Sequence, residues 1–548
     1  MSVLGPRTPL SALQAASWAT VAALAALGAT TLPPALELGD AAAAPLPRNE
    51  WLDDAVAIRM TDNGLEFVTE ELEGFINEEL PPIIEGVSNI WLLYGCTWSY
   101  SAYISYVDKA SFNYPAFTLD PRTGYLDAHL DIPNFSMDFM LEGDGLFCAD
   151  HYTCWSNVTA NRLVADARVY LDVINGEVVT RIEGVNANVS GYEYDTSWDC
   201  FIIELVAEIM QSTIEGMLEE TLETVITDKL PDLLNDLFAG LDLSGDVELF
   251  GTTMGVDFLP HSDSIEESGG TFNVAAANRS YYGGCNPEFT GSRYVYTPPV
   301  DYPDEIPEVG GPYDIAISVT ENAWNSMLYM AYDTGALCIQ LDENSEEIYG
   351  ISINQTTTDL QRIFPTLYAA YPDAPLRVDL IPQNPPLVSI GTAQGRLNGQ
   401  MEAIIRTAYV DLYVWNENAW HLALRVDTEY GAELLVQVNQ ENKIRIVMSN
   451  YPEIEMTILE EPLVPIGDRV VEKVIPFILR IASPLLFASL DYYPLPEIFG
   501  YGYNIAAIVP DGPEENLLSL YGTLYSDEGI RPTSWGSDQI QWSVVEPN

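Results

Sequence analysis

The sequence contains one stretch twice, and this repeat limits the folds that the chain can adopt. Residues 56–80 read VAIRMTDNGLEFVTEELEGFINEEL, and residues 315–337 read IAISVTENAWNSMLYMAYDTGAL. Each copy opens with alternating apolar residues, which predict a short strand, and continues with apolar residues at helical spacing. Positions in the second copy lie 259 residues after their counterparts, as Ile315 does after Val56.

A threonine stands between strand and helix in both copies. Thr61 precedes Asp62 in the first copy, and Thr320 precedes Glu321 in the second. A threonine hydroxyl caps a helix N-terminus, and an acid in the first turn interacts favourably with the helix dipole. The sequence therefore predicts, in each half, a strand that leads into a capped amphipathic helix.

A second pair of helical patterns has the same offset. One spans residues 206–229 and is expected to end at Leu230-Pro231, and the other spans residues 466–483. Two helices in the same order at the same shift indicate a duplicated domain. Pro81-Pro82 is likewise expected to end the helix of the first copy.

Between the helices of each half, apolar and polar residues alternate. Residues 91–192 and 376–460 predict two meanders of antiparallel strands with one buried face. The expected organisation is a targeting segment at 1–44, an N-terminal barrel at 50–260, a linker rich in Gly, Pro and acids at 261–312, a C-terminal barrel at 313–526 and a tail at 527–548.

The N-terminus has the pattern of an export signal. Arg7 precedes an apolar run over residues 10–32, and an Ala-rich stretch follows. We expect a secreted or periplasmic protein, with an uncleaved anchor as the alternative.

Six cysteines in an exported chain favour disulfides over free thiols. We expect at least one bridge from Cys200, to Cys148 or Cys154, because these two precede the helix by one hairpin. The spacing of Cys148, His151 and Cys154 leaves a partial zinc site open as an alternative, although it matches no standard finger.

The motifs of several enzyme classes are absent from the sequence. No lysine follows a glycine as in a phosphate-binding loop, and no G-x-S-x-G or H-E-x-x-H occurs. A catalytic triad assembled from distant residues stays open, but nothing in the sequence points to one. We therefore expect no enzyme activity, no metal and no cofactor.

Several segments resemble one family, in the order and spacing that the family has. The chain resembles the bactericidal/permeability-increasing protein, the lipopolysaccharide-binding protein and the plasma lipid-transfer proteins, within the tubular lipid-binding superfamily. The segments that carry the resemblance are AVAIRMTDNGLEF from Ala55, MAYDTGALCIQL from Met330, PPLVSI from Pro385, YPLPEI from Tyr493 and ENLLSLYGTLY from Glu515.

The resemblance implies an α+β fold of two elongated barrels in a boomerang. Each barrel would be a twisted antiparallel sheet wrapped on a long helix, and a central antiparallel sheet would join them. It also implies grooves between helix and sheet that bind a phospholipid or a similar two-chain lipid, with a membrane surface as a further partner and no nucleic acid. The expected lipid-binding residues are Leu65, Val68, Leu72, Phe75, Val206, Met210, Ile214, Met217, Trp324, Met327, Leu328, Val474 and Ile478. The alternative is a surface or interaction module that keeps the scaffold and binds no lipid.

The charge balance is strongly acidic, with 22 basic against 81 acidic residues and a formal net charge of −59. Such a surface repels nucleic acid and anionic lipid headgroups. Acids also occur four residues apart on one helix, as at Glu66 and Glu70 or Glu215 and Glu219, and each such pair costs roughly 0.2–0.5 kcal/mol at low salt. Adaptation to a salty or calcium-bearing medium and general solubility both explain this composition.

We predict that the melting temperature rises as NaCl or calcium is added, because screening relieves these repulsions. Thermal unfolding followed from low to molar salt checks this. A melting temperature that stays flat or falls would mean that the fold already compensates the acids.

Overall fold

The structure is a computed structural model that describes part of the chain. Its described residues are 51–86, 88–93, 102–144, 151–196, 207–238, 245–249, 252–279, 285–287, 302–307, 309–342, 356–391, 401–439, 443–449, 453–466, 493–494, 502–512 and 515–525. The expected targeting segment, the second-half helix beyond residue 466 and the tail lie outside these ranges.

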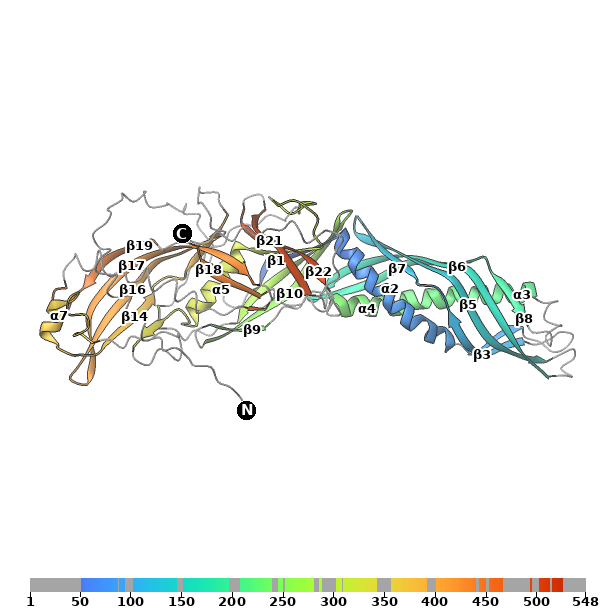
Figure 1. Ribbon diagram of the computed structural model, residues 1–548, viewed down its shortest axis with the longest axis horizontal. Helices are drawn as coiled ribbons and strands as arrows, with labels where there is room; N and C mark the ends of the chain where they lie inside the picture. The colour runs from blue at the N-terminus through green and yellow to red at the C-terminus, as the bar shows by residue number, and fades with distance from the viewer. Residues whose placement is uncertain are drawn as a thin grey trace, which may run out of the picture. The chain divides into compact units, whose positions relative to one another are not determined.

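A seven-stranded antiparallel sheet combines strands from both halves of the chain (Figure 1). The first half contributes β1 (Leu52–Thr61), β9 (Gly245–Leu249), β10 (Thr252–Glu266) and β11 (Gly269–Arg279). The second half contributes β12 (Ile315–Thr320), β21 (Gly502–Asp511) and β22 (Leu517–Tyr525). The strand order is β21-β22-β12-β1-β11-β10-β9, so the halves meet where β12 pairs with β1.

Each half also forms an antiparallel sheet of its own. The N-terminal sheet contains β2 (Ser88–Leu93), β3 (Ala102–Ser111), β4 (Ala116–Arg122), β5 (Tyr125–Asp144), β6 (His151–Ile174), β7 (Glu177–Ser190) and β8 (Glu193–Thr196). The C-terminal sheet contains β13 (Ile339–Leu341), β14 (Leu376–Pro382), β15 (Leu387–Ile390), β16 (Met401–Asn416), β17 (Ala419–Val438), β18 (Lys443–Met448), β19 (Glu453–Glu460) and β20 (Tyr493–Pro494). Two curled sheets and a third that combines both halves confirm the expected fold class.

The helices lie against these sheets. In the first half they are α2 (Asp62–Glu85), α3 (Ala207–Thr224), the π-helical turn η4 (Val225–Lys229) and α4 (Leu230–Phe238). In the second half they are α5 (Glu321–Asp333) and α7 (Pro365–Ala370). The strand-to-helix step that the repeat predicts is therefore present in both copies, as β1–α2 and β12–α5.

The two copies of the repeat pair with each other symmetrically. Ile58 lies opposite Ile317, which is its own counterpart in the second copy. Val56 lies opposite Val319, and Met60 lies opposite Ile315. The antiparallel pairing therefore places a local two-fold axis at the Ile58–Ile317 pair, as in an isologous dimer interface.

The capping threonines strengthen this pairing. Thr61 accepts a hydrogen bond from the Gly64 amide and donates its hydroxyl to the Tyr313 carbonyl, at 2.5 Å, while its backbone amide donates to the Asp314 carbonyl at 3.0 Å. Thr320 accepts from the Ala323 amide and donates to the Ala55 carbonyl, at 3.1 Å. Each helix cap thus also bonds the backbone in, or directly before, the strand of the other copy.

Proline does not end the helices where the sequence predicts. α2 continues through Pro81 and Pro82 to Glu85, and the carbonyls that lose their partners belong to the exposed residues Asn77 and Glu78. The later helix does not end at Leu230-Pro231 but continues as α4 after the π-helical turn η4, where the Leu230 amide bonds to the Val225 carbonyl five residues earlier. Both predicted ends were wrong.

The expected linker over residues 261–312 begins with regular structure. Residues 261–279 belong to the β10–β11 hairpin of the central sheet, where β11 pairs with β1. The Gly and Ser residues of this stretch obscure the alternation of apolar and polar residues that would have predicted strands. The domain boundaries themselves stay a prediction.

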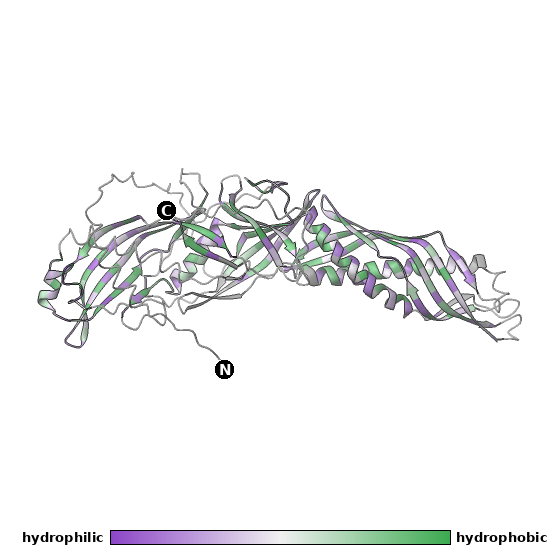
Figure 2. Ribbon diagram, viewed as in Figure 1, coloured by the Kyte–Doolittle hydropathy of each residue, from purple (hydrophilic) through white to green (hydrophobic). Residues whose placement is uncertain are grey.

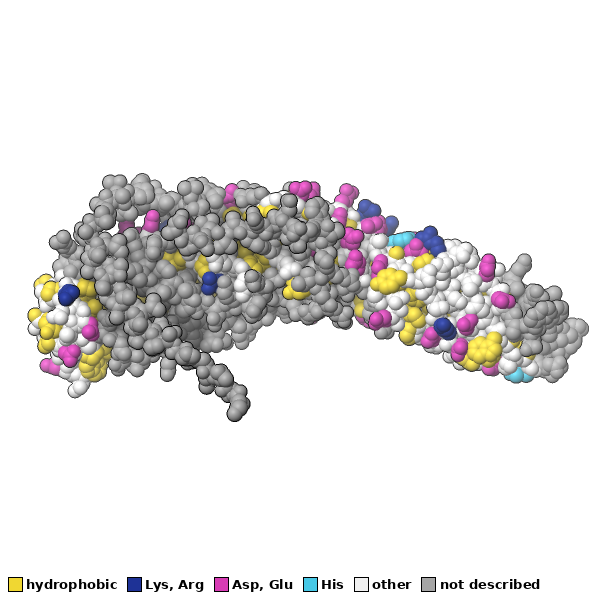
Figure 3. Space-filling model, viewed as in Figure 1, with side chains coloured by type: hydrophobic (Ala, Val, Ile, Leu, Met, Phe, Trp, Pro, Cys, Tyr) yellow, Lys and Arg dark blue, Asp and Glu magenta, His cyan; other side chains and the backbone are white. Residues whose placement is uncertain are grey.

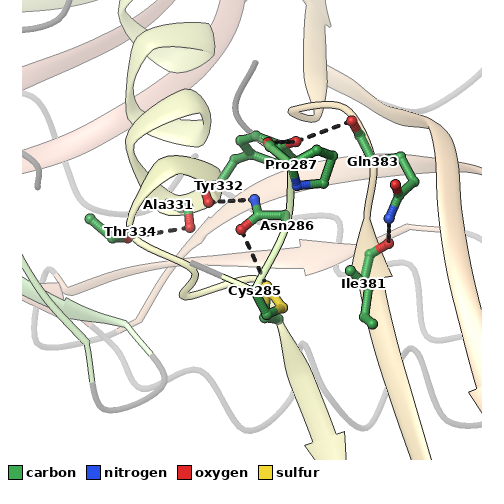
Figure 4. Close-up of a disulfide and its surroundings, with 9 residues drawn as sticks. Cys285, Asn286, Pro287, Ala331, Tyr332, Thr334, Ile381 and Gln383 are labelled. Carbon is green, nitrogen blue, oxygen red and sulfur yellow. Dashed lines mark hydrogen bonds between the residues drawn. A yellow bond between two sulfur atoms is a disulfide. The ribbon is translucent and has the colours of Figure 1, made fainter. Parts of the chain in front are cut away.

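A disulfide between Cys285 and Cys338 fastens this connection to the end of α5 (Figure 4). Beside it, the Asn286 amide donates to the Tyr332 carbonyl at 2.6 Å, and the Tyr332 hydroxyl donates to the Pro287 carbonyl at 2.6 Å. Cys154 is also disulfide-bonded, so its thiolate is not free for the zinc alternative. The predicted bridge from Cys200 lies outside the described residues.

We predict that Gly64→Ala lowers the free energy of unfolding by about 2 kcal/mol. A Cβ atom at Gly64 would lie 2.3 Å from the Asp314 carbonyl oxygen, and neither backbone can yield without shifting the β1–β12 pair. The control is Gly216→Ala in α3, where nothing lies within 4 Å, and there we expect a gain of about 1 kcal/mol. Urea unfolding measures the free energy of unfolding of both variants. If Gly64→Ala stabilises the protein as much as Gly216→Ala does, the added Cβ atom at Gly64 meets no clash.

Candidate functional site

The N-terminal sheet has a continuous apolar inner face. Buried and outward residues alternate along all of β5 and most of β6, and Figure 2 shows the matching alternation of hydropathy. The alternation changes phase at Asn134, whose φ of 53° lies in the left-handed region, so the face stays apolar on both sides of the irregularity. The inward residues of β5 are Leu126, Ala128, Leu130, Ile132, Phe135, Met137, Phe139 and Leu141.

Two helices bring apolar stripes into the same core. Leu65, Val68 and Leu72 of α2 are buried there. Ile214 of α3 is fully buried, and Met217 is 7% exposed. The structure therefore brings these five predicted residues together in one cluster with the inner face of the sheet.

A few polar atoms lie within this apolar interior. The Ser156 hydroxyl lies 2.9 Å from the Tyr194 hydroxyl, and burial raises the pKa of Tyr194 to about 12, so the phenol stays neutral at physiological pH. The Thr180 Oγ1 and Tyr192 hydroxyl atoms are buried and have no hydrogen-bond partner. A buried hydroxyl without a partner costs free energy, which makes these atoms candidates for polar contacts with a ligand.

The second half has a smaller apolar cluster beside α5. Trp324 and Leu328 pack against buried residues of β15 to β17 and against Leu518 of the central sheet. The indole Nε1 of Trp324 is buried and has no hydrogen-bond partner. Met327 is half-buried on the same helix.

Polar residues on the same face of α5 hold an edge strand. The Asn325 side chain donates to the Val388 carbonyl at 3.1 Å and accepts from the Val388 amide at 2.7 Å. Glu321, one turn earlier, accepts from the Ile390 amide at 3.2 Å. Because these bonds imitate a neighbouring strand, β15 is fixed beside α5 and contributes Val388 and Ile390 to the apolar cluster.

Five predicted residues are not placed by the described structure. Phe75 and Met210 belong to α2 and α3, but their side chains lie outside what is described. Val206, Val474 and Ile478 lie outside the described ranges. For every predicted residue, contact with lipid stays a prediction.

The free edges of the N-terminal sheet are closed by helix side chains, which the sequence did not reveal. On one edge, Glu73 accepts from the Phe117 amide at 2.9 Å and Glu85 accepts from the Ala110 amide at 3.1 Å. On the other edge, Asn235 accepts from the Thr180 amide at 2.7 Å and Glu219 accepts from the Val189 amide at 3.4 Å. No periodicity distinguishes these acceptors from other exposed polar residues on the helices.

The outer face of the sheet carries acids that pair with three of its arginines, whereas Arg168 lies over the Tyr125 ring at 5.4 Å. Arg122 pairs with Asp127, and Arg181 pairs with Asp172. The hydrogen bond from Arg162 holds the pKa of Asp131 below its usual range. Acidic and basic side chains both lie on the face drawn in Figure 3.

Within the described ranges, no group of three or more His, Cys, Asp or Glu residues is arranged to hold a metal ion. No helix in the described part of the chain combines the length and the apolar character needed to cross a membrane.

Comparison with known proteins finds a family model that matches much of the second half of the chain. Residues 304–481 match the family model of the LBP/BPI/CETP family, C-terminal domain. This match confirms the resemblance for these residues, and the LBP/BPI/CETP family is a family of lipid-binding and lipid-transfer proteins. No curated protein sequence matches the chain.

Solved structures overlay on most of the chain, but loosely. The lipopolysaccharide binding protein covers 87% of this chain and 99% of its own, with 13% identity and a TM-score of 0.47. P47 of Clostridium botulinum E1 covers 86% of this chain and 99% of its own, with 8% identity and a TM-score of 0.29. Overlays at these scores carry no conclusion about function.

We predict that Asn325→Ala lowers the free energy of unfolding by about 2–4 kcal/mol, because a buried amide and a buried carbonyl of Val388 both lose their partner. Denaturant unfolding measures the loss. Asn325→Asp keeps the acceptor but places a carboxylate oxygen against the Val388 carbonyl, so it should also destabilise, and less at a pH low enough to protonate the carboxyl so that it can donate. If both variants unfold like the parent protein, α5 does not hold β15.

Proposed function

We propose that this chain is an exported lipid-binding or lipid-transfer protein that holds acyl chains between its helices and the inner faces of its sheets. The observation that carries the proposal is the uninterrupted apolar inner face of β5. Its 20 residues span roughly 65 Å at about 3.4 Å per residue. One bilayer leaflet has about 15 Å of hydrocarbon, half of a core of about 30 Å. The inner face is therefore long enough to contact an acyl chain over its full length.

The mechanism would be passive. Burial of an acyl chain gains about 0.8 kcal/mol per CH₂ relative to water, and a bilayer provides the same gain. Uptake from a membrane is then close to neutral, and no energy source is needed. The units at residues 50–260 and 313–526 would each shield a chain of a phospholipid or similar two-chain lipid during transit.

Two further observations support export. Members of the LBP/BPI/CETP family are typically secreted. The Cys285–Cys338 bridge is also typical of an oxidising compartment.

The competing function is a surface or interaction module that binds no lipid. The packing of the interior favours it, because Val68 and Ile214 are 1% and 0% exposed through contacts within the protein itself. A lipid extract of protein purified without detergent distinguishes the two functions. We expect phospholipid in the extract, and its absence together with a failure to take up a fluorescent lipid would favour the module.

We predict that Ile214→Glu lowers the lipid content of the purified protein several-fold. An ionised carboxylate in this apolar interior is costly, so it would exclude an acyl chain or raise its own pKa. Ser212→Glu is the matched control, because it adds the same charge two residues away at an exposed position. Mass spectrometry of the extracts measures the lipid, and circular dichroism verifies folding. A folded Ile214→Glu variant with full lipid content would remove this face of α3 from the site.

A further inference from the structure

The N-terminal sheet is closed by two lateral seams, each between a strand edge and a helix. One seam joins α2 to β3 and β4, through Glu73 and Glu85. The other joins α3–η4–α4 to β7, through Glu219 and Asn235. A strand edge that pairs with another strand gains a ladder of backbone bonds, whereas each seam here shows single side-chain acceptors far apart. The two seams are therefore the places where the N-terminal sheet and its helices are joined by the fewest hydrogen bonds among the described residues.

The β7 seam is irregular in both its strand and its helix, and its two bonds differ most in length. The Thr180–Asn235 bond is the shortest of the four, at 2.7 Å. The Val189–Glu219 bond is the longest of the four, at 3.4 Å. Between its two bonds the strand and the helix are both irregular. The register of β7 against β6 shifts near Gly184, whose φ is +67°, and the helix widens into η4 at Val225–Lys229. A π-helical turn lacks the regular hydrogen-bond ladder and marks a point where a helix bends or moves.

The inner side of this seam also presents a polar atom without a partner. Thr180 donates its backbone amide to Asn235, while its side chain is 7% exposed and its Oγ1 has no hydrogen-bond partner. An otherwise apolar interior gains nothing from such a hydroxyl. An ester group of an entering lipid would supply the missing acceptor.

We propose that the seam between β7 and α3–η4–α4 is the lateral portal through which an ester-linked lipid passes its acyl chain into the interior, with Asn235 and Glu219 as positioning residues that hold it closed. This inference rests on the proposed lipid-binding function. We expect the opposite seam to stay closed during exchange, because α2 runs as one α-helix from Glu73 to Glu85 and has no π-helical turn between its two bonds.

The first test measures lipid transfer. A fluorescent phosphatidylcholine analogue moves from phosphatidylcholine vesicles to the protein in a stopped-flow instrument. Loss of one hydrogen bond changes an opening equilibrium about fivefold, so Asn235→Ala and Glu219→Ala should each speed uptake and release by about that factor and leave the amount bound at equilibrium unchanged. Asn235→Asp keeps the acceptor and should behave like the parent protein.

Glu73→Ala is the matched control, because it also removes one acceptor and one negative charge, but at the other seam. Its transfer rate should equal that of the parent protein. The proposal is overturned if Glu73→Ala speeds transfer as much as Glu219→Ala does, or if Asn235→Ala and Glu219→Ala leave the rate unchanged. Circular dichroism verifies that each variant is folded.

The second test needs no lipid. Native-state hydrogen exchange should show faster exchange at the Thr180 and Val189 amides than at the Phe117 and Ala110 amides, and Asn235→Ala should widen this difference. Equal or slower exchange at β7 would overturn the portal. If the parent protein takes up no lipid but β7 exchanges faster as expected, the lipid-binding function fails and the mobile seam stands.

Discussion

The pairing of β1 with β12 is the interaction on which the rest of the structure depends. It joins two copies of one sequence unit around the Ile58–Ile317 pair, and it forms the middle of the sheet that combines both halves. Each copy starts its helix at the threonine that ends this strand, so the pairing also fixes where α2 and α5 begin. A slip of β12 against β1 by one residue would turn every side chain of the slipped strand to the opposite face of the sheet. The duplicated origin and the buried core therefore select the same register.

The symmetry holds at this axis and is lost along the helices. Gly64 in α2 approaches the Asp314 carbonyl so closely that no side chain fits, whereas its counterpart in α5 is Ala323. α2 continues for 24 residues and closes the edge of a long sheet, while α5 ends after 13 residues and uses Asn325 and Glu321 to hold β15. The same strand-to-helix unit thus closes an edge of the N-terminal sheet in one half and of the C-terminal sheet in the other. In both, a polar helix side chain completes the hydrogen bonding of a strand edge.

Periodicity in the sequence was sufficient to predict the elements that bury one face. The long meanders, the repeated strand and helix and the two threonine caps were all predicted correctly, because each depends on local spacing. The ends of the helices were not, because a proline ends a helix only when the carbonyls that it leaves unpaired cannot be satisfied otherwise. Exposed carbonyls at Asn77 and Glu78 and a π-helical turn before Pro231 provide such solutions. The Cys285–Cys338 bridge depends on contacts between distant segments, so spacing could not select it.

The acidic helices illustrate why a sequence pattern can be described correctly and still be incompletely interpreted. Glutamates four residues apart were read as repulsive pairs that salt would relieve. In the structure one of these glutamates, Glu219, accepts a hydrogen bond from the edge of β7, as Glu73 and Glu85 do at the opposite edge of the sheet, and bonds to a charged acceptor are stronger than neutral ones. Part of the repulsion is therefore offset by these bonds, which a neutral acceptor would form less strongly. Each such bond joins only one strand-edge amide to one carboxylate. These bonds therefore close the edges of the N-terminal sheet without the cooperative ladder of hydrogen bonds that a paired strand would form. A wall of this kind can open locally while the sheets and the β1–β12 pair remain intact.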